Sequence, residues 1–292
     1  MAKFLITGAK GQVGYCLTEQ LTGKGDILAV DRDELDITDR DAVFSAVKTF
    51  KPDVIINAAA HTAVDRAESE VELSEAINVK GSQYLAEAAS EIDAVILHIS
   101  TDYVFEGTGT GEYKEGDQTN PQGVYGRTKL EGEIVVQQAN SRSIILRTAW
   151  VFGEHGHNFV KTMLRLAKDR DSLGIVGDQF GGPTYAGDIA KALIEIANQI
   201  LAGKENAFGV YHFTGKPYVS WYEFAKAIFA EAELQNILEK SPLVNSIATS
   251  DYPTPAKRPA NSRLDLTKIK QVFNIEASDW RNALTNIKAY QS

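Results

Sequence analysis

A tyrosine and a lysine four residues apart, Tyr125 and Lys129, are the residues of this chain best suited to acid–base chemistry. In a helix this spacing places both side chains on one face. A phenol titrates near pH 10, so a tyrosine that works at neutral pH needs a lower pKa, which a nearby ammonium group provides by favouring the phenolate. The pattern therefore predicts an acid–base pair, although Tyr-x-x-x-Lys also occurs by chance on solvated helix surfaces.

A hydroxyl group is expected close to this pair. Thr101 and Asp102 follow the predicted strand 95–100 directly, and the tyrosine comes one loop later. In open α/β sheets the active groups gather at the carboxyl ends of the strands. Thr101 is therefore predicted to share a site with Tyr125 and Lys129.

A glycine-rich loop, Gly8–Gly14 with the spacing G-x-x-G-x-x-G, joins the first predicted strand to the first predicted helix. Glycines at this place allow a tight turn and let a pyrophosphate approach the free N–H groups at the helix N-terminus. Asp31 ends the second predicted strand, where a carboxylate can accept hydrogen bonds from an adenosine ribose. Together these features predict a nicotinamide dinucleotide cofactor, and Arg32 beside Asp31 leaves the choice between NADH and NADPH open.

The elements that must position these groups alternate between short aliphatic strands and amphipathic helices, which predicts an α/β fold with a doubly wound parallel sheet of the Rossmann type. The predicted strands are 4–7, 27–30, 54–56, 95–100 and 143–147, and the predicted helices between them are 12–21, 40–50, 71–89 and 125–138. After about residue 151 prolines, glycines and aromatics cluster. We therefore predict a dinucleotide-binding domain at 1–152 and a smaller, mostly helical substrate-binding lobe at 153–292, with some of its segments returning to the sheet.

Composition excludes several classes of protein. The 292 residues carry a net charge of −9, which disfavours a broad basic surface for nucleic acid. The one cysteine, Cys16, excludes an intrachain disulfide and a cysteine-based zinc site, and the histidines have no metal-binding spacing, so no metal is predicted. No apolar run reaches the length of a membrane span. A cytoplasmic location is expected.

Strings along nearly the whole chain resemble the extended short-chain dehydrogenase/reductase family, and more narrowly its members that act on dTDP-4-dehydrorhamnose. These strings are Gly11–Gly14, Asn57–Asp65, Ser100–Phe105, Arg147–Val151, Asn158–Lys168, Asp178–Thr184 and Arg258–Leu264. The resemblance implies NADPH or NADH as cofactor, a nucleotide sugar as substrate, and reduction of the sugar C4 keto group to give dTDP-L-rhamnose.

The resemblance also implies roles for individual residues. Tyr125 is the general acid, Lys129 lowers its pKa and holds the cofactor ribose, and Thr101 polarises the carbonyl. Asp102 and Trp150 contact the sugar. The implied cofactor contacts are Gly8, Gly11, Gln12, Val13 and Gly14 around the pyrophosphate, Asp31 at the ribose, Asp36 and Ile37 at the adenine, and Ala60, His61 and Thr62 further along.

Basic residues in the second region are candidates for the substrate diphosphate. Arg258 and Arg263 lie among prolines and small residues, and guanidinium groups bind phosphates in bidentate fashion, so we predict that both contact the substrate. Lys161 and Arg165, four residues apart on one predicted helix, favour a solvated charged face instead.

One departure from the family concerns assembly. Some members hold a metal at a dimer interface with glutamates, one of them two residues after the last glycine of the loop, where this chain has Cys16. This disfavours a magnesium-bridged dimer and leaves another kind of homodimer open.

Two alternative functions remain open. The first is a nucleotide-sugar dehydratase or epimerase, which would keep its cofactor bound. The dehydratases that this chain resembles carry Thr-Asp-Glu at the end of this strand, however, where this chain has Thr101-Asp102-Tyr103. A non-catalytic subunit like the regulatory subunit of methionine adenosyltransferase is the other alternative, and the presence of Thr101, Tyr125 and Lys129 weighs against it.

Overall fold

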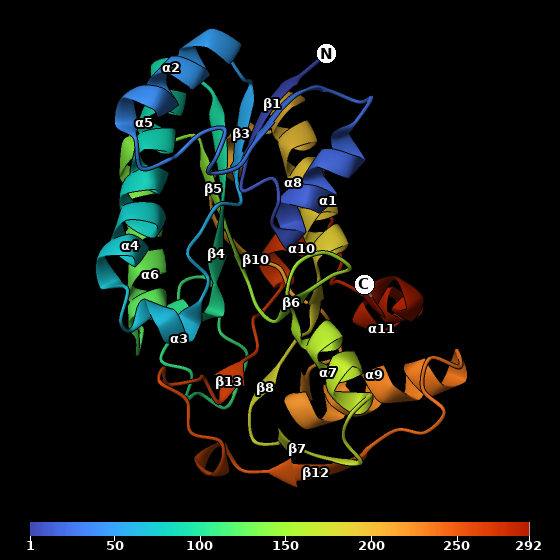
Figure 1. Cartoon of the computed structure of the whole chain (residues 1–292). Helices are drawn as coiled ribbons and strands as arrows, with labels where there is room; N and C mark the ends of the chain where they lie inside the picture. The colour runs from blue at the N-terminus through green and yellow to red at the C-terminus, as the bar shows by residue number, and fades with distance from the viewer. Residues whose placement is uncertain (292) are drawn as a thin grey trace.

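The computed structural model describes residues 1–291, and its centre is a parallel sheet in the order β10-β5-β4-β3-β1-β2 (Figure 1). Its strands are β1 (Lys3–Thr7), β2 (Asp26–Val30), β3 (Val54–Asn57), β4 (Val95–Thr101), β5 (Ser143–Thr148) and β10 (Gly209–His212). The five strands predicted from the sequence agree with the structure to within one residue at each end. The predicted α/β class with a doubly wound parallel sheet is confirmed.

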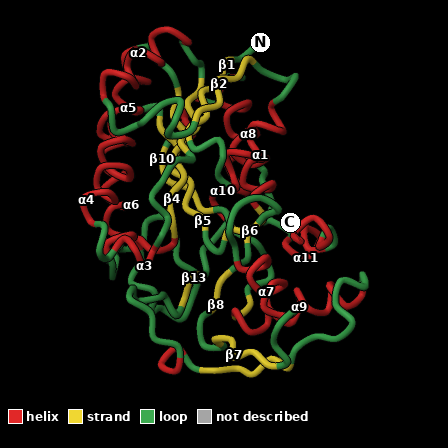
Figure 2. The backbone as a smooth tube through the Cα atoms, in the orientation of Figure 1, coloured by secondary structure: helices red, strands yellow, loops and turns green. Residues whose placement is uncertain are grey.

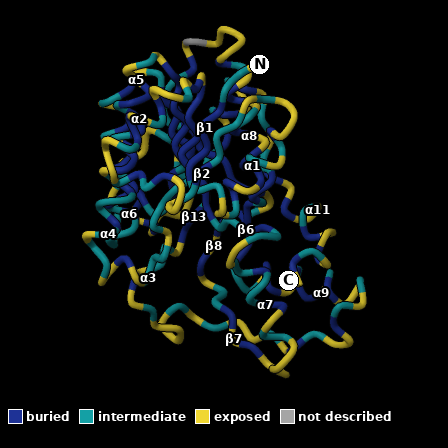
Figure 3. Tube along the Cα trace, turned by 45° about the horizontal axis from the view of Figure 1, so that its top comes forward, coloured by how far each residue is buried: buried dark blue, intermediate teal, exposed yellow. Residues whose placement is uncertain are grey.

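Helices cover both faces of this sheet (Figure 1). On one face lie α1 (Gln12–Leu21), α8 (Ala186–Leu201) and α10 (Thr267–Phe273), and on the other lie α2 (Arg40–Phe50), α5 (Ser82–Glu91) and α6 (Val124–Ala139). Each layer encloses its own apolar core. Strands β3 and β5 are buried along their whole length, as expected for strands covered on both faces. Figure 3 shows the buried residues gathered around the sheet, near the labels β1 and β2.

The topological switch point lies between β1 and β3. Strand β1 pairs with β2 on one side and with β3 on the other, so the connections after β1 and β2 leave the sheet in opposite directions. Ligands of open α/β sheets bind in the crevice at the carboxyl ends of strands at such a point. The glycine-rich loop follows β1 at this place.

The region predicted as one helix at 71–89 contains a local change of winding. It begins as α4 (Val71–Glu75), continues as the π-helical segment η1 (Ala76–Gly81), and ends as α5. A short helix, α3 (Val64–Ala67), precedes it. Single π-helical turns are rare and occur often at functional sites. Hydrophobic periodicity gave no sign of this one, because a π turn adds one residue without ending the apolar stripe.

A second cluster of elements lies below the carboxyl edge of the sheet in the view of Figures 1 and 2. It packs α7 (Phe159–Ala167), α9 (Trp221–Leu234), β7 (Ser172–Val176) and β12 (Leu243–Ile247) around their own apolar core. Two elements late in the chain lie with the sheet instead. Strand β10 is one of its strands, and helix α8 packs on one of its faces. The division into domains at 152/153 stays a prediction.

Short elements complete the description. They are β6 (Val151–Phe152), β8 (Phe180–Gly181), β9 (Thr184–Tyr185), β11 (Val219–Ser220), β13 (Asn261–Ser262), α11 (Trp280–Leu284) and the 3₁₀ turns η2 (Asp102–Val104), η3 (Glu205–Ala207), η4 (Thr249–Asp251) and η5 (Ile287–Gln291). Within residues 1–291, none of the helices has the length and apolar character needed to span a bilayer.

Candidate active site

Three backbone segments meet at the glycine-rich loop. Gly8 has a φ of +69°, a conformation that other residues rarely adopt, and a Cβ atom there would lie 2.7 Å from the Ala58 carbonyl oxygen. A Cβ at Gly14 would lie only 2.0 Å from the carbonyl oxygen of Gly8. Gly11 is the N-cap residue of α1, and no side chain there accepts a hydrogen bond from the free N–H groups of the helix. This cradle of bare backbone at a helix N-terminus fits a dinucleotide pyrophosphate.

A cavity of about 320 Å³ adjoins this loop. It is lined by Gly8, Gly11, Asp31, Arg32, Leu35, Asp36, Ile37, Thr38, Ala59, Ala60, Leu73, Ala76 and Ile77. The set includes six of the predicted cofactor residues. Asp31 is held at the rim, because its two carboxylate oxygens accept hydrogen bonds from the backbone N–H groups of Lys10 (2.9 Å) and Arg32 (2.8 Å).

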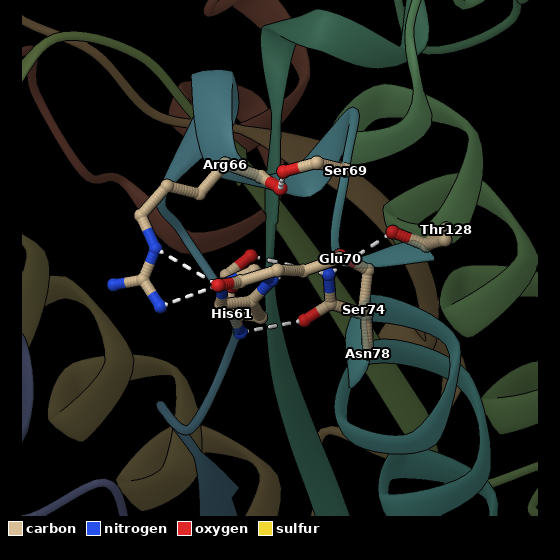
Figure 4. Close-up of polar contacts among 7 residues, drawn as sticks. All are labelled: His61, Arg66, Ser69, Glu70, Ser74, Asn78 and Thr128. Atoms are coloured by element: carbon tan, nitrogen blue, oxygen red, sulfur yellow. Dashed lines mark hydrogen bonds and ion pairs between the residues drawn. The ribbon is translucent and has the colours of Figure 1, made fainter. Parts of the chain in front are cut away.

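Other predicted cofactor residues surround this cavity without lining it. Val13 and Gly14 are buried in α1, and the Gln12 side chain accepts a hydrogen bond from Asn158 Nδ2 at 3.2 Å. Thr62 is exposed. The His61 ring points toward Ser74 Oγ (2.8 Å) and Glu70 Oε2 (3.1 Å), as Figure 4 shows, and the His61 backbone N–H donates to Asn78 Oδ1 at 2.8 Å. The ring and the backbone N–H of His61 are therefore both bonded within the protein.

The structure brings the three predicted catalytic residues to the carboxyl end of β4. Thr101 is the last residue of this strand, and Tyr125 and Lys129 lie in the first turns of α6. The buried Lys129 ammonium donates a 2.6 Å hydrogen bond to the Ile99 carbonyl oxygen. The Thr101 hydroxyl donates to Asp102 Oδ1 at 3.0 Å.

Burial dominates the electrostatics of this group. It lowers the pKa of Lys129 to about 8, with Glu133 acting in the opposite direction. It raises the pKa of Tyr125 above the usual value of about 10, and a hydrogen bond with Thr101 opposes this rise. The lowering of the Tyr125 pKa that the sequence led us to expect is therefore absent. Tyr125 holds its proton at neutral pH, which is the state that a general acid needs.

Asp102 is a second buried titratable group. Burial raises its pKa to about 6, and hydrogen bonds with Ser262 and Thr101 oppose that rise. Its Oδ2 atom is buried and has no hydrogen-bond partner among the described residues. A buried carboxylate oxygen without a partner is costly, so this atom is suited to accept a hydrogen bond from a ligand.

A larger cavity of about 720 Å³ lies between the sheet edge and the second cluster of elements. Trp150 lines it with a φ of +51°, and its ring stacks on that of Trp221 at 3.6 Å between centroids. Tyr103 lines the same cavity and places its ring 5.3 Å from the ring of Tyr125, edge to face. The Tyr103 ring therefore connects this cavity to Tyr125.

Arg258 is fixed inside this larger cavity. One guanidinium nitrogen donates to Tyr103 Oη at 3.1 Å and another to Asp65 Oδ2 at 2.5 Å. Arg165, which the sequence placed on a solvated face, also lines the cavity, together with Arg170. Arg165 is nevertheless exposed, as the sequence predicted, and its solvated face borders the cavity.

Arg263 does not reach the cavity. Its guanidinium donates to the Thr110 carbonyl oxygen and to Asn261 Oδ1, both at 2.7 Å. Lys161 donates to the Glu154 carbonyl oxygen at 3.0 Å. These two side chains stabilise loops, as the hydrogen bonds show.

Sequence reasoning missed Asp65, Trp221 and Arg170 as site residues. Asp65 lies in the short segment after β3, at the sheet edge where functional groups collect, and this position could have indicated it. Trp221 and Arg170 had no such signal, because only tertiary packing brings α9 and the loop after α7 to the wall of this cavity.

No group of three or more histidine, cysteine, aspartate or glutamate side chains within residues 1–291 is arranged to hold a metal ion. Cys16 is buried, and burial raises the pKa of its thiol to about 11, so it is protonated and packs as a small apolar residue. The expectation that the protein uses no metal stays a prediction.

A glycine cradle at the switch point and a Tyr-x-x-x-Lys pair at the neighbouring strand end define the extended short-chain dehydrogenases/reductases, and this chain has both. Comparison with family models identifies the family within this class to which the chain belongs. The model described as "RmlD substrate binding domain" matches residues 2–291, and the chain belongs to this family.

Individual relatives agree with this assignment. The chain is 60% identical to the dTDP-4-dehydrorhamnose reductase of Aggregatibacter actinomycetemcomitans over 99% of both chains. A dTDP-4-dehydrorhamnose reductase structure from Clostridium acetobutylicum superposes with a TM-score of 0.92 at 40% identity, covering 99% of this chain and 100% of that one. The Bacillus anthracis reductase in complex with NADP gives a TM-score of 0.90 at 35% identity, with 98% of each chain covered.

Proposed function

We propose that this protein is an NAD(P)H-dependent reductase that converts dTDP-4-dehydrorhamnose to dTDP-L-rhamnose. The observation that carries the proposal is the position of Tyr125. It lies in the first turn of α6 beside the carboxyl end of β4, and one strand, β3, separates β4 from β1 and the glycine cradle. Its ring contacts Tyr103 in the wall of the larger cavity. Its relatives are named for this reaction, and one of their structures holds NADP.

The smaller cavity and the glycine cradle would hold the dinucleotide. Gly8, Gly11 and Gly14 leave room for the pyrophosphate, and Asp31, Asp36 and Ile37 line the part that fits the adenosine end. When bound, NADPH or NADH supplies the hydride that reduces the sugar C4. Arg32 beside Asp31 at the rim is compatible with a 2′-phosphate, so both coenzymes remain candidates.

Side chains of the protein stabilise and neutralise the negative charge that develops on the reacting oxygen. Tyr125, protonated at neutral pH, gives its proton to the oxygen on C4 as that oxygen becomes negative. Thr101 turns its hydroxyl proton from Asp102 toward the carbonyl and so polarises it. The Lys129 ammonium, held by the Ile99 carbonyl, adds a positive charge within the same buried region.

The larger cavity would hold the nucleotide sugar. Trp150 would pack against the sugar, and the open oxygen of Asp102 would accept a hydrogen bond from a sugar hydroxyl. Arg258, with Arg165 and Arg170 along the same wall, would attract the diphosphate, an attraction that a protein with a net charge of −9 must provide locally. The structure gives no comparable role to Arg263.

The direct test is oxidation of NADPH or NADH by the purified protein in the presence of dTDP-4-keto-6-deoxy-L-lyxo-hexose. We expect one coenzyme oxidised for each sugar reduced. A parallel incubation with dTDP-glucose and NADP or NAD tests the dehydratase alternative. Formation of a 4-keto-6-deoxy sugar there would contradict the proposed reaction on this fold. A cytoplasmic location and a homodimer stay predictions.

A further inference from the structure

Residues 252–259 form a strap along one wall of the larger cavity. The strap runs from η4 to β13, and in Figure 1 it passes below α3 on this way. Three of its eight residues are prolines, which have no N–H to donate. Within residues 1–291, no hydrogen bond between backbone groups joins residues 253–259 to another segment. Side chains must therefore hold the strap in place.

The carboxylate of Asp65, in α3, holds the strap at two points. Its Oδ1 accepts a hydrogen bond from the Ala256 backbone N–H at 3.2 Å. Its Oδ2 accepts one from the Arg258 guanidinium at 2.5 Å. Ala256 is buried, whereas its neighbours Pro255 and Lys257 are exposed. One side chain therefore fixes both the backbone of the strap and the guanidinium group that the strap carries.

Arg258 is oriented by a second contact. Another of its nitrogens donates to Tyr103 Oη at 3.1 Å, so two of the five guanidinium N–H groups are bonded within residues 1–291. Because the guanidinium is planar, two fixed nitrogens set the plane of the whole group. Arg258, Asp65 and Tyr103 all line the larger cavity. The remaining guanidinium N–H groups are thus left for a ligand in this cavity, and their orientation is fixed.

The segment that contains Asp65 is itself held in place. Ala67, at the end of α3, is fully buried. Glu68, the next residue, accepts a hydrogen bond from the Val124 backbone N–H at 2.9 Å. Val124 is the first residue of α6, and the N-cap residue of this helix is a glycine with no side chain to bond it. The segment that holds the strap is therefore bonded to the helix that carries Tyr125.

We infer that Asp65 is a positioning residue, which holds the strap and orients Arg258 toward the diphosphate of the nucleotide sugar. The role rests on the proposed function, because it concerns the binding of that substrate. Charge alone argues the other way, since a carboxylate close to a diphosphate repels it. An acidic residue in the wall of an anion site favours binding only where the orientation that it imposes on the arginine outweighs this repulsion.

Asp65→Asn tests the role, because repulsion and positioning predict opposite signs. The asparagine keeps the shape of the side chain, and its Oδ1 can still accept from Ala256, but its amide group cannot accept a hydrogen bond from Arg258. We expect the Kd for dTDP, measured by calorimetry, and the KM for the sugar to rise about tenfold. The Kd for NADPH and kcat at saturating sugar should stay within about twofold of wild type.

Two comparisons separate positioning from a general loss of stability. In the background of Arg258→Ala, Asp65→Asn should change the Kd for dTDP by less than about twofold, since the group that it positions is gone. Asp117→Asn is the matched control. This exposed aspartate also accepts a backbone N–H, that of Lys114 at 2.8 Å, but it lines neither cavity, so its replacement should leave the Kd for dTDP unchanged.

Three outcomes would overturn the inference. The first is a Kd for dTDP in Asp65→Asn that is equal to or lower than that of wild type. The second is an equal rise in Asp117→Asn, and the third is a full further rise when Asp65→Asn is added to Arg258→Ala. Failure of the proposed function would show differently, as a wild-type protein that binds no dTDP or does not reduce the sugar.

Discussion

Replacing Lys129 with methionine is expected to stabilise the fold at neutral pH while it removes most of the activity. The ammonium group is almost fully buried, and burial lowers its pKa from 10.5 to about 8. A lysine whose pKa is lower in the folded than in the unfolded protein opposes folding wherever it is charged in both states. Methionine fills a similar volume without a charge.

The magnitude follows from these two pKa values. Each pKa unit corresponds to about 1.4 kcal/mol, so keeping Lys129 charged in the fold costs about 3 kcal/mol at pH 7. The variant also loses the hydrogen bond to the Ile99 carbonyl, and leaving such a group without a partner costs about 1–2 kcal/mol. The net expectation is a free energy of unfolding about 1–2 kcal/mol higher than that of wild type at pH 7.

The sign of the pH dependence is specific. Between the folded pKa of about 8 and the unfolded value of 10.5, the unfolded wild type binds more protons than the folded one, so its stability rises with pH. At pH 9.5 the cost of the buried charge has fallen to about 1.4 kcal/mol. The advantage of the methionine variant should therefore shrink by about 2 kcal/mol between pH 7 and pH 9.5.

Urea unfolding at the two pH values, followed by circular dichroism, measures this difference. Lys80→Met is the matched control, since it makes the same substitution at an exposed lysine in η1. A Lys129→Met variant that is less stable than wild type at pH 7, or whose difference from wild type does not change with pH, would refute the reasoning.

Three further predictions concern single side chains. Tyr125→Phe should lower kcat about 10²–10⁴-fold with an unchanged Kd for NADPH, because only the proton donor is lost; turnover near that of wild type would remove Tyr125 as the general acid. Arg258→Lys should raise the KM for the nucleotide sugar about tenfold and leave NADPH binding unchanged, since an ammonium cannot reproduce the planar fork that Asp65 and Tyr103 hold; an unchanged KM would count against diphosphate contact. Gly14→Ala should abolish NADPH binding or folding, because the new Cβ would lie 2.0 Å from a backbone oxygen, whereas Gly116→Ala, in open space, should bind NADPH normally in the same titration.

The local parts of the site could be predicted because their physics is local. The glycine spacing and the four-residue step from Tyr125 to Lys129 depend only on backbone freedom and helical period, both of which a sequence displays. The parallel sheet followed from alternating apolar runs and amphipathic helices. Even the placement of Thr101 beside the pair needed only the rule that functional groups collect at the carboxyl ends of parallel strands.

The environment of these residues could not be predicted in the same way. The sequence led us to expect that Lys129 lowers the Tyr125 pKa, but the depth of burial decides that balance, and burial depends on every segment packed above the site. The two arginines that were both predicted to contact the substrate lie in different places. Arg258 lines the cavity and donates a hydrogen bond to Asp65, which lies nearly two hundred residues earlier in the chain. Arg263 donates to a carbonyl oxygen in a loop.

What the sequence by itself determined is therefore the order of the candidate groups along the chain: a glycine-rich loop, a threonine at a strand end, and a tyrosine followed four residues later by a lysine. Tertiary structure decided which distant segments enclose that chemistry. It stacked Trp150 on Trp221, joined Asn78 to both His61 and Thr128, and buried Lys129. The physical reason is that helical period and glycine freedom act within a few residues, whereas desolvation and contacts between remote segments exist only after the chain has packed.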